Sequence, residues 1–367
     1  IINMTEALKK ETIGLITGGR WHLAPYNFLK KSNFDVIVFD DNPNCFLKKT
    51  NVRIEKIRNL DNYKKIFFWA PCNDLGSRLA DDYNNNKYNI RTNFYKFSNN
   101  KKEVYKKIGI KELLINRIDN KKIYIKKPVY GSGSRNIALF SGKINKKKYF
   151  LQEFIEGIEI SVEIYSYKGK HKIIQTSLRI LKKYKSALCI ASADINQKFI
   201  KKILNKINNI YKKIKIINGI SHLELIIDKN KKIFPIDINF RMGGAGVTEY
   251  LLNNTLSLNL FKIDFDTLRN NKCYKNFKIF KYGFLVFEYH NNKHLQKKLF
   301  NFKKLGAYIM LKTTSGISKK ESDNNRSSML YVNLKDKNIL YQKLKLILTR
   351  EKYLEFKKKI TELAKYK

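Results

Sequence analysis

Short apolar runs alternate with stretches of helical character over the first hundred residues, and this alternation restricts the folds that the chain can adopt. The apolar runs cover residues 12–19, 35–42 and 65–71, and helices fit the segments 21–33 and 74–84. A helix between two strands returns the chain across the sheet, so that the strands pair in parallel. The pattern therefore predicts an α/β fold that begins with a parallel sheet.

Extended segments dominate the rest of the chain. Strands are predicted at 122–129, 149–155, 160–167, 172–178, 222–228 and 233–240, the last two joined by a turn at Lys229–Lys232. Helices are predicted at about 99–113, 196–215 and 247–261. The C-terminal part carries three more predicted strands, at 284–290, 307–313 and 330–336, followed by a helix at about 338–349.

The chain of 367 residues carries a formal net charge of +44, which raises the question of a nucleic-acid or membrane partner. Only 12 of its 75 basic residues are Arg, the residue suited to forked recognition of phosphates and base edges. The lysines are spread along the chain together with Asn and Ile, as in the products of a genome rich in A and T, and are expected on solvated faces. We expect no specific nucleic-acid partner, although a general attraction to polyanions follows from the charge.

Cysteine usage and hydropathy indicate the compartment. The four cysteines are far apart and form no C-x-x-C pair: Cys45, Cys72, Cys189 and Cys273. This spacing predicts neither a zinc site nor a disulfide framework. No apolar run reaches the roughly 20 residues that cross a bilayer, and the start of the sequence lacks the pattern of a signal peptide. We expect a cytoplasmic protein with no membrane partner.

A loop of small residues follows the predicted strand that ends at Pro128. It contains Gly131, Ser132, Gly133 and Ser134, with Lys126 and Lys127 before it and Arg135 after it. Glycine lets backbone N–H groups approach a phosphate closely, serine adds donors, and the basic side chains offset charge. No G-K-[ST] sequence closes the loop, so it is not a Walker loop. The pattern fits a polyphosphate site, and it also fits a flexible hairpin.

A second segment, Gln152 to Glu159, pairs an extended stretch with an acid. Its backbone could offer a C=O and an N–H to the edge of an adenine ring, and Glu159 could hold ribose hydroxyls. Taken alone, the same residues fit a strand followed by an acidic turn.

The third segment places acids inside apolar strands. Asp237 and Asn239 lie two residues apart on one strand and share a face, and Arg241 continues the alternation. Glu224 lies on the partner strand across the Lys229–Lys232 turn and can meet them. Buried acids are costly unless they are paired or metal-bound, and Mg²⁺ prefers oxygen ligands with one or two carboxylates. This group predicts a magnesium site.

Together, and in this order, the three segments resemble the ATP-grasp superfamily, in particular its carboxylate–amine ligase and carbamoyl-phosphate-synthase-like branch, which includes L-amino-acid ligases. The matching elements are IKKPVYGSGSRNI (125–137), FLQEFIEGIEISVEI (150–164), HLELIID (222–228) and IFPIDINFRMGG (233–244). The match covers roughly residues 98–262 well and the flanking parts more loosely. It implies an α+β ATP-grasp fold with three parts: a Rossmann-like N-terminal domain (1–97), an ATP-grasp domain (98–277) with a lid at about 118–157, and a small C-terminal α+β domain (278–367).

The resemblance also implies roles in binding ATP. Lys127 would contact the α- and β-phosphates, and the loop from Gly131 to Arg135 would close over the γ-phosphate. The backbones of Glu153 and Ile155 would bind the adenine edge, and Glu159 the ribose. An earlier lysine of the family falls at Lys101 or Lys102. The full implied ATP-binding set is Lys101, Lys127, Gly131, Ser132, Gly133, Ser134, Gln152, Glu153, Phe154, Ile155 and Glu159.

Metal and substrate roles follow in the same way. Glu224, Asp237 and Asn239 would hold one or two Mg²⁺ (or Mn²⁺) ions. Arg241, Lys127 and Arg135 would be catalytic, and the substrate would meet Arg241, Gly243, Gly244 and His222. The sequence departs from the family's usual pattern at Asp237, where Glu is common, and at Phe240, where Pro is common.

The implied function is an ADP-forming ligase that activates a small carboxylate as an acyl phosphate and joins it to an amine. Two alternatives stay open: phosphorylation of bicarbonate or carbamate, and a basic nucleic-acid-binding protein with a vestigial ATP site. Specificity is expected from the N-terminal domain, the loop after Gly243 and the segment 179–193. Arg179 could pair with a substrate carboxylate or form a surface salt bridge, and the C-terminal strands could cover the site or form a homodimer surface.

Overall fold

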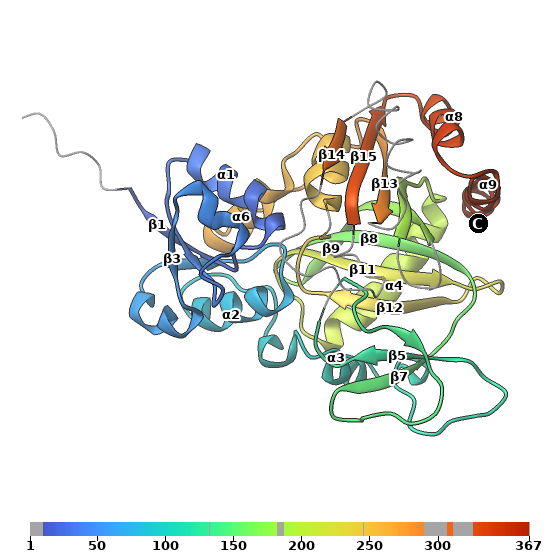
Figure 1. Cartoon of the computed structure of the whole chain (residues 1–367), viewed down its shortest axis with the longest axis horizontal. Coiled ribbons are helices and arrows are strands. Elements are labelled where there is room, and N and C mark those ends of the chain that lie inside the picture. The colour runs from blue at the N-terminus through green and yellow to red at the C-terminus, as the bar shows by residue number, and fades with distance from the viewer. Residues whose placement is uncertain are drawn as a thin grey trace, which may run out of the picture.

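The structure is a computed structural model that describes residues 10–131, 133–181, 187–244, 246–289, 307–310 and 326–366 (Figure 1). The strands of these residues form three sheets, with orders β3-β2-β1-β4, β6-β5-β7 and β12-β11-β8-β9-β10-β13-β15-β14. The N-terminal sheet lies at one end of the molecule and the three-stranded sheet lies below the large central one (Figure 1). The predicted mixture of a parallel sheet with antiparallel sheets is confirmed.

The N-terminal sheet is parallel, as the alternation of apolar and helical segments predicted. Its strands and helices are β1 (Thr12–Ile16), α1 (Leu23–Lys31), β2 (Asp35–Phe39), β3 (Arg53–Glu55), β4 (Phe67–Trp69) and α2 (Asp74–Asn84). Almost every residue of the central strands is buried, as expected for a sheet that is covered on both faces. Helix α2 begins at Asp74, where the side chain of Asn73 caps it by accepting from the Gly76 N–H at 2.8 Å.

The turn after β1 is held by packing and hydrogen bonding. The Gly18 N–H donates to Asp40 Oδ2 at 2.7 Å. A Cβ at Gly18 would clash with the Cys45 sulfur, so this position accepts only glycine. This amide serves the tight turn itself.

The three-stranded sheet is built from the segment around the glycine-serine loop. Its strands are β5 (Tyr124–Pro128), β6 (Ala138–Leu139) and β7 (Tyr149–Glu153), and α3 (Lys101–Ile108) precedes it. The residue at position 132, one of the predicted loop residues, lies outside the described part of the chain. Helix α3 buries Val104, Tyr105 and Ile108 against the same core as β7 and β8.

The central sheet contains eight antiparallel strands and includes the C-terminal strands. Its members are β8 (Ile158–Tyr167), β9 (Lys170–Leu181), β10 (Ala187–Ser192), β11 (Gly219–Ile227), β12 (Ile233–Asn239), β13 (Tyr282–Tyr289), β14 (Ala307–Met310) and β15 (Arg326–Leu334). Residue 290 of the predicted strand 284–290 and residues 311–313 of the predicted strand 307–313 lie outside the described part of the chain.

Helices cover the central sheet. Helix α4 (Gln197–Lys213) buries Phe199, Ile203, Ile207 and Ile210, which recur at helical spacing. The others are α8 (Lys337–Ile347) and α9 (Arg350–Lys365). The existence of α8 was predicted, whereas α9 and β10 were not.

The single helix predicted at 247–261 is wrong, because the chain breaks it into three pieces. A π-helix at Val247–Leu252 and the short α5 (Asn253–Thr255) come first, and α6 (Leu260–Arg269) follows. The interruption has a local cause: Asn259 Oδ1 accepts from the Phe261 N–H at 2.9 Å and starts a new helix. Helix α6 then packs beside α1 on the N-terminal sheet (Figure 1).

A buried carboxylate joins the N-terminal sheet to the central sheet. Asp264 of α6 is fully buried and accepts from Trp69 Nε1 at 2.8 Å and from the Ile220 N–H at 2.8 Å. The buried Arg91 forms an ion pair with the same carboxylate. Gly219 beside it has φ +82°, and a Cβ there would approach Asp264 Oδ1 to 2.9 Å. One side chain thus connects β4, β11 and α6.

The helices and the cysteines agree with a protein that has neither a membrane-spanning helix nor a disulfide among the described residues. Among the described residues, no helix is long and apolar enough to cross a membrane. All four cysteines are free thiols, in agreement with the absence of a disulfide framework predicted from their spacing.

We predict that Asp264→Ala lowers the free energy of unfolding by about 3–5 kcal/mol, because the buried Arg91 guanidinium would lose its charged partner. Denaturant unfolding followed by circular dichroism measures this loss. Asp82→Ala, which removes an exposed acid of α2, serves as the control and should stay within about 0.5 kcal/mol of the wild type. Equal effects of the two substitutions would contradict the structural role of Asp264.

Candidate functional site

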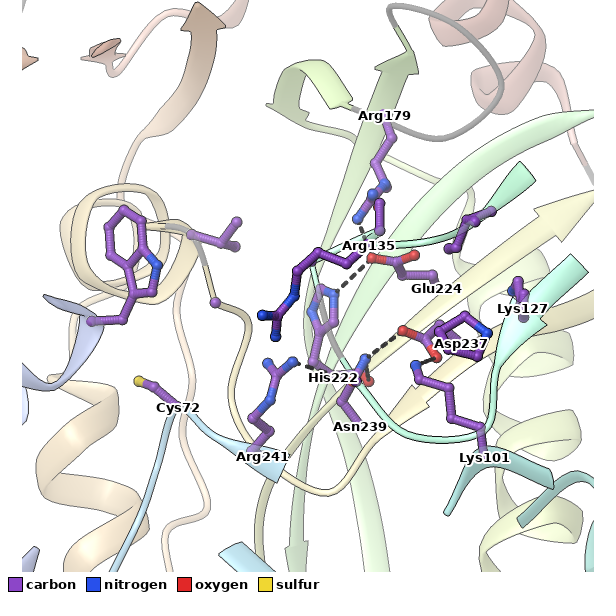
Figure 2. Close-up of a pocket in the computed structure, with 18 of the residues that line it drawn as sticks. Cys72, Lys101, Lys127, Arg135, Arg179, His222, Glu224, Asp237, Asn239 and Arg241 are labelled. Atoms are coloured by element: carbon purple, nitrogen blue, oxygen red, sulfur yellow. Dashed lines mark hydrogen bonds and ion pairs between the residues drawn. The ribbon is translucent and has the colours of Figure 1, made fainter. Parts of the chain in front are cut away.

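The hairpin of β11 and β12 brings the predicted acids together. In its register Glu224 lies opposite Asp237 and His222 lies opposite Asn239. These four side chains and Arg241 line one cavity of about 150 Å³, which we call the hairpin cavity (Figure 2). The alternation of side chains along a strand explains the arrangement, because every second residue of β12 faces the same side.

Two lysines from other elements meet the acids of the hairpin. Lys101, at the start of α3, forms an ion pair with Asp237 (Figure 2). Lys127 of β5 is buried, and its Nζ donates to the Ile236 carbonyl at 2.5 Å. Burial lowers the pKa of Lys127 to about 8, while Asp237 opposes this shift and Lys101 adds to it. Both predicted lysines therefore lie at the hairpin, and the Lys127 ammonium group loses its proton at a lower pH than an exposed lysine does.

Arg179 occupies an unexpected position. The sequence left open a contact with substrate or a surface salt bridge, but its side chain is buried and pairs with two acids of the site. Arg179 Nε lies 2.7 Å from Glu159 Oε1, and the same guanidinium forms an ion pair with Glu224. Burial opposes the ionised form of Glu224, yet Arg179 and His222 outweigh it and hold its pKa below the usual value. Burial raises the pKa of Glu159 to about 7, although Arg179 works against this rise.

His222 is part of a buried charge pair. Its Nδ1 contacts Glu163 of the neighbouring strand β8, and its Nε2 lies 3.6 Å from Glu224. Burial disfavours the charged imidazole, but the adjoining Glu163 outweighs burial and raises the pKa of His222 to about 9. A cationic imidazole thus faces the hairpin cavity.

Arg241 is held by the N-terminal sheet. Its Nε lies 2.9 Å from Asp74 Oδ1, at the first turn of α2, and its Nη1 donates to the Met242 carbonyl at 2.8 Å. A further contact joins Nη2 to Asn239 Oδ1 at 3.3 Å. Asp74 was not singled out from the sequence. A signal for it existed, because it follows β4, and ligands of parallel sheets bind outside the carboxyl ends of the strands.

The glycine-serine loop reaches over the same cavity. Gly131, Gly133, Ser134 and Arg135 all line it, while Ser132 is not described. Gly131 has φ +125° and Gly133 φ +69°, values that explain glycine at both positions. Figure 2 shows the Arg135 side chain directed to the region of His222 and Arg241.

A second cavity of about 290 Å³ adjoins the first, and we call it the Gln152 cavity. Lys127, Ser134 and Glu224 line both cavities. The predicted adenine and ribose residues line it as well: Gln152, Glu153, Phe154, Ile155 and Glu159. Gln152 is 2% exposed, and its Oε1 finds no hydrogen-bond partner within the part of the chain that the structure describes. A buried amide oxygen without a partner is costly and points to a ligand that donates to it.

The donors of the hairpin fit a magnesium ion. Glu224, Asp237 and Asn239 offer hard oxygen atoms on paired strands, which is the chemistry that Mg²⁺ prefers. Burial works against ionisation of Asp237, but Lys101 outweighs it and lowers the pKa, so the carboxylate is ionised. The described residues contain no group of three or more His, Cys, Asp or Glu side chains able to hold a metal by themselves. Such a site would therefore rely on phosphate oxygens to complete the coordination.

The hairpin cavity also has apolar lining residues. Trp21, Cys72, Ile190 and Val247 line it in addition to the charged groups. Burial raises the pKa of Cys72 to about 12, so its thiol is neutral. These side chains come from the three regions from which the sequence predicted specificity: the N-terminal domain, the segment 179–193 and the loop after Gly243.

The comparisons with known proteins agree with this geometry. A family model described as an ATP-grasp domain matches residues 127–249. No curated protein matches the chain by sequence. The fold is similar to that of an L-amino acid ligase from Bacillus licheniformis, with a TM-score of 0.68, 11% identity, and coverage of 95% of this chain and 98% of the other.

Two further structures are similar. N5-carboxyaminoimidazole synthetase from Staphylococcus aureus, complexed with ADP, has a TM-score of 0.69 and 14% identity, with coverage of 94% of this chain and 98% of that one. Biotin carboxylase from Campylobacter jejuni, in a β,γ-ATP complex, has a TM-score of 0.61 and 12% identity, with coverage of 94% and 92%.

The fold and the matched segment define a protein with an ATP-grasp domain. Residues 127–249 match an ATP-grasp domain, which confirms over this segment the resemblance seen in the sequence.

We predict that Gly243→Ala lowers the free energy of unfolding by about 1–3 kcal/mol, because its Cβ would lie 2.8 Å from Glu163 Oε1 and 3.1 Å from His222 Nδ1. The matched control is Gly244→Ala, where the nearest atom, Arg241 Nη1, lies at an ordinary 3.6 Å. Thermal and denaturant unfolding of both variants measures the difference. A Gly244→Ala variant as unstable as Gly243→Ala would contradict the tight packing around His222.

We predict that the affinity for metal-free ADP falls above pH 8. Above pH 8 the Lys127 ammonium group of the free protein loses its proton, whereas a bound phosphate favours the charged form. The affinity therefore falls by at most about tenfold for each pH unit. Calorimetry between pH 7 and 9.5 measures it. Lys127→Arg keeps its charge over this range and should bind with a flatter profile. If both proteins lost affinity equally, another group such as His222 would carry the effect.

Proposed function

We propose that the chain is an ADP-forming ligase that uses ATP to activate a small organic carboxylate and joins the product to an amine. The observation that carries this proposal is the continuity of the two cavities. Lys127, Ser134 and Glu224 border both of them, so a nucleotide in one could present its phosphates to a substrate in the other.

The Gln152 cavity supports the nucleotide part of the proposal. The unpartnered Oε1 of Gln152 could accept a hydrogen bond from the amino group of adenine. Glu159 could hold the ribose hydroxyls. Two of the similar structures were solved with adenine nucleotides, ADP in one and β,γ-ATP in the other.

The boundary between the cavities suits the phosphates. Lys127 and Arg135 would neutralise their charge, and the backbone of the glycine loop would lie over them. Glu224, Asp237 and Asn239 would hold Mg²⁺, which would add further charge neutralisation when bound. Lys101 forms an ion pair with Asp237. When a metal ion binds Asp237, the Lys101 ammonium group would contact the phosphates instead.

The proposed reaction has two steps. A carboxylate oxygen of the substrate attacks the γ-phosphorus of ATP, the bond to the β,γ-bridging oxygen breaks, and ADP leaves with those electrons. The amine then attacks the acyl carbon, and inorganic phosphate leaves after the amine loses a proton. Arg241, fixed by Asp74, would hold the carboxylate and then the acyl phosphate. Closure of the glycine loop would keep water from the acyl phosphate.

The apolar lining residues of the hairpin cavity favour an organic acid over bicarbonate. Bicarbonate has no carbon skeleton that would contact Trp21, Ile190 or Val247. The site gives no support to the nucleic-acid alternative. Its basic side chains face acidic side chains inside a cavity and do not form an exposed basic surface. Lys101, Arg179 and Arg241 each pair with a carboxylate there.

The test is product analysis. Purified protein with Mg-ATP is offered pools of amino acids and other small carboxylates, with and without amines, and with bicarbonate in a separate reaction. We expect ADP and phosphate only with an organic carboxylate pool. Glu224→Ala should abolish this turnover, because it removes a metal ligand and leaves Arg179 with one partner fewer. Asp82→Ala, an exposed acid, should leave it unchanged.

Other products would contradict the proposal in distinguishable ways. AMP and pyrophosphate would exclude an acyl phosphate intermediate. Turnover with bicarbonate alone would establish the carbamoyl-phosphate type of reaction instead. If the protein bound nucleic acid and did not bind ATP, the result would support the alternative of a nucleic-acid-binding protein with a vestigial ATP site.

A further inference from the structure

The C-terminal helix contributes side chains to the Gln152 cavity. Lys352, Glu355 and Lys359 of α9 line it together with the segment from Gln152 to Gly157. Their spacing of three and four residues places them on one face of the helix. No sequence pattern indicated this contribution, because α9 begins nearly 200 residues after Gln152.

Helix α9 is firmly mounted, so this face has a fixed position. Phe356 and Leu363 are buried in the main core, and so is Tyr366, just after the helix. The Tyr366 ring packs on Phe199 with centroids 4.9 Å apart, and Phe356 packs on Tyr341 at 5.0 Å. Thr349 caps the first turn by accepting from the Lys352 N–H. The three polar side chains are therefore presented from a rigid element.

The three side chains form one charged unit. Glu355 accepts from Lys352 at 2.8 Å and from Lys359 at 2.7 Å, which leaves a net charge of +1. The two lysine side chains are 23% and 22% exposed, whereas Lys357 and Lys358 on the same helix are exposed. Lys359 also acts electrostatically on Glu159. This unit is thus part of the cavity wall and differs from the solvated lysines of the surface.

The unit adds donors to this cavity. The side chains of Glu153, Glu156 and Glu159 offer acceptors to it, whereas the ring nitrogens of a purine accept hydrogen bonds, and ribose hydroxyls can accept as well as donate. Lys127, the other lysine of this cavity, lies at the boundary with the hairpin cavity. Among the described residues, Lys352 and Lys359 are the lysines that line the remainder of the Gln152 cavity.

We propose that Lys352 and Lys359 are nucleotide-binding residues that donate to the base and ribose end of the bound nucleotide, with Glu355 holding both ammonium groups in place. The C-terminal helix is then a wall of the nucleotide site. This inference rests on the proposed function, in that the Gln152 cavity must take an adenine nucleotide.

Titration calorimetry with Mg-ADP on the full chain tests it. Lys352→Ala/Lys359→Ala should raise the Kd about tenfold, the loss expected for two modest hydrogen bonds. The matched control is Lys357→Ala/Lys358→Ala, which removes the same charge from the exposed part of the same helix and should change the Kd less than twofold. Unfolding curves of both variants check that the fold is intact.

Two further arms separate direct contact from general electrostatics. The loss should be the same for AMP, ADP and ATP and should persist at high salt, because the contacts are to the base and ribose. A loss that grows with the number of phosphates and disappears with salt would overturn the proposal. A triple variant that also carries Glu355→Ala should keep the loss. Recovery of wild-type affinity in it would show that an unpaired Glu355 repels the nucleotide, and would overturn the proposal too.

The outcomes also separate this inference from the proposed function. If the wild type binds Mg-ADP and both double variants bind equally well, the role of α9 is wrong and the ligase proposal stands. If the wild type does not bind any adenine nucleotide, both proposals fail together.

Discussion

The buried carboxylate of Asp264 is the interaction on which the relation between the two halves of the site depends. It accepts hydrogen bonds from Trp69 of the N-terminal sheet and from the backbone of Ile220 in the central sheet, and it neutralises Arg91. The N-terminal sheet is thereby fixed against the hairpin that carries the acids. This placement lets Asp74, at the start of α2, reach Arg241, just after β12 of the central sheet.

Charge pairing dominates the site. Lys101 pairs with Asp237, Arg179 with Glu224, and Arg241 with Asp74, all in or beside one small cavity. Buried charges require such partners, since the cost of leaving one unpaired exceeds that of most other defects. In the proposed function, some of these side chains change partner when Mg²⁺ and a nucleotide bind. The acids then contact the metal, and the basic side chains contact the phosphates.

Local patterns allowed part of the site to be predicted. The alternation in IFPIDINF placed Asp237 and Asn239 on one face, and a short turn brought Glu224 opposite, as the register shows. Arg179 could not be placed in this way, because its partners depend on the pairing of β8, β9 and β11. The expected helix at 247–261 failed because a capping asparagine outweighed a continuous apolar pattern. The roles assigned to the residues in catalysis and binding stay predictions.

The sequence by itself determined the fold class, the hairpin and the match of residues 127–249 to an ATP-grasp domain, because periodicity, turns and motifs act over short distances along the chain. Only the tertiary structure decided which distant groups meet. Asp74 reaches Arg241 across 167 residues, and side chains of α9 line the same cavity as Gln152. Such contacts follow from the packing of sheets and helices, which buries apolar surface without regard to separation in the sequence. No local pattern records them.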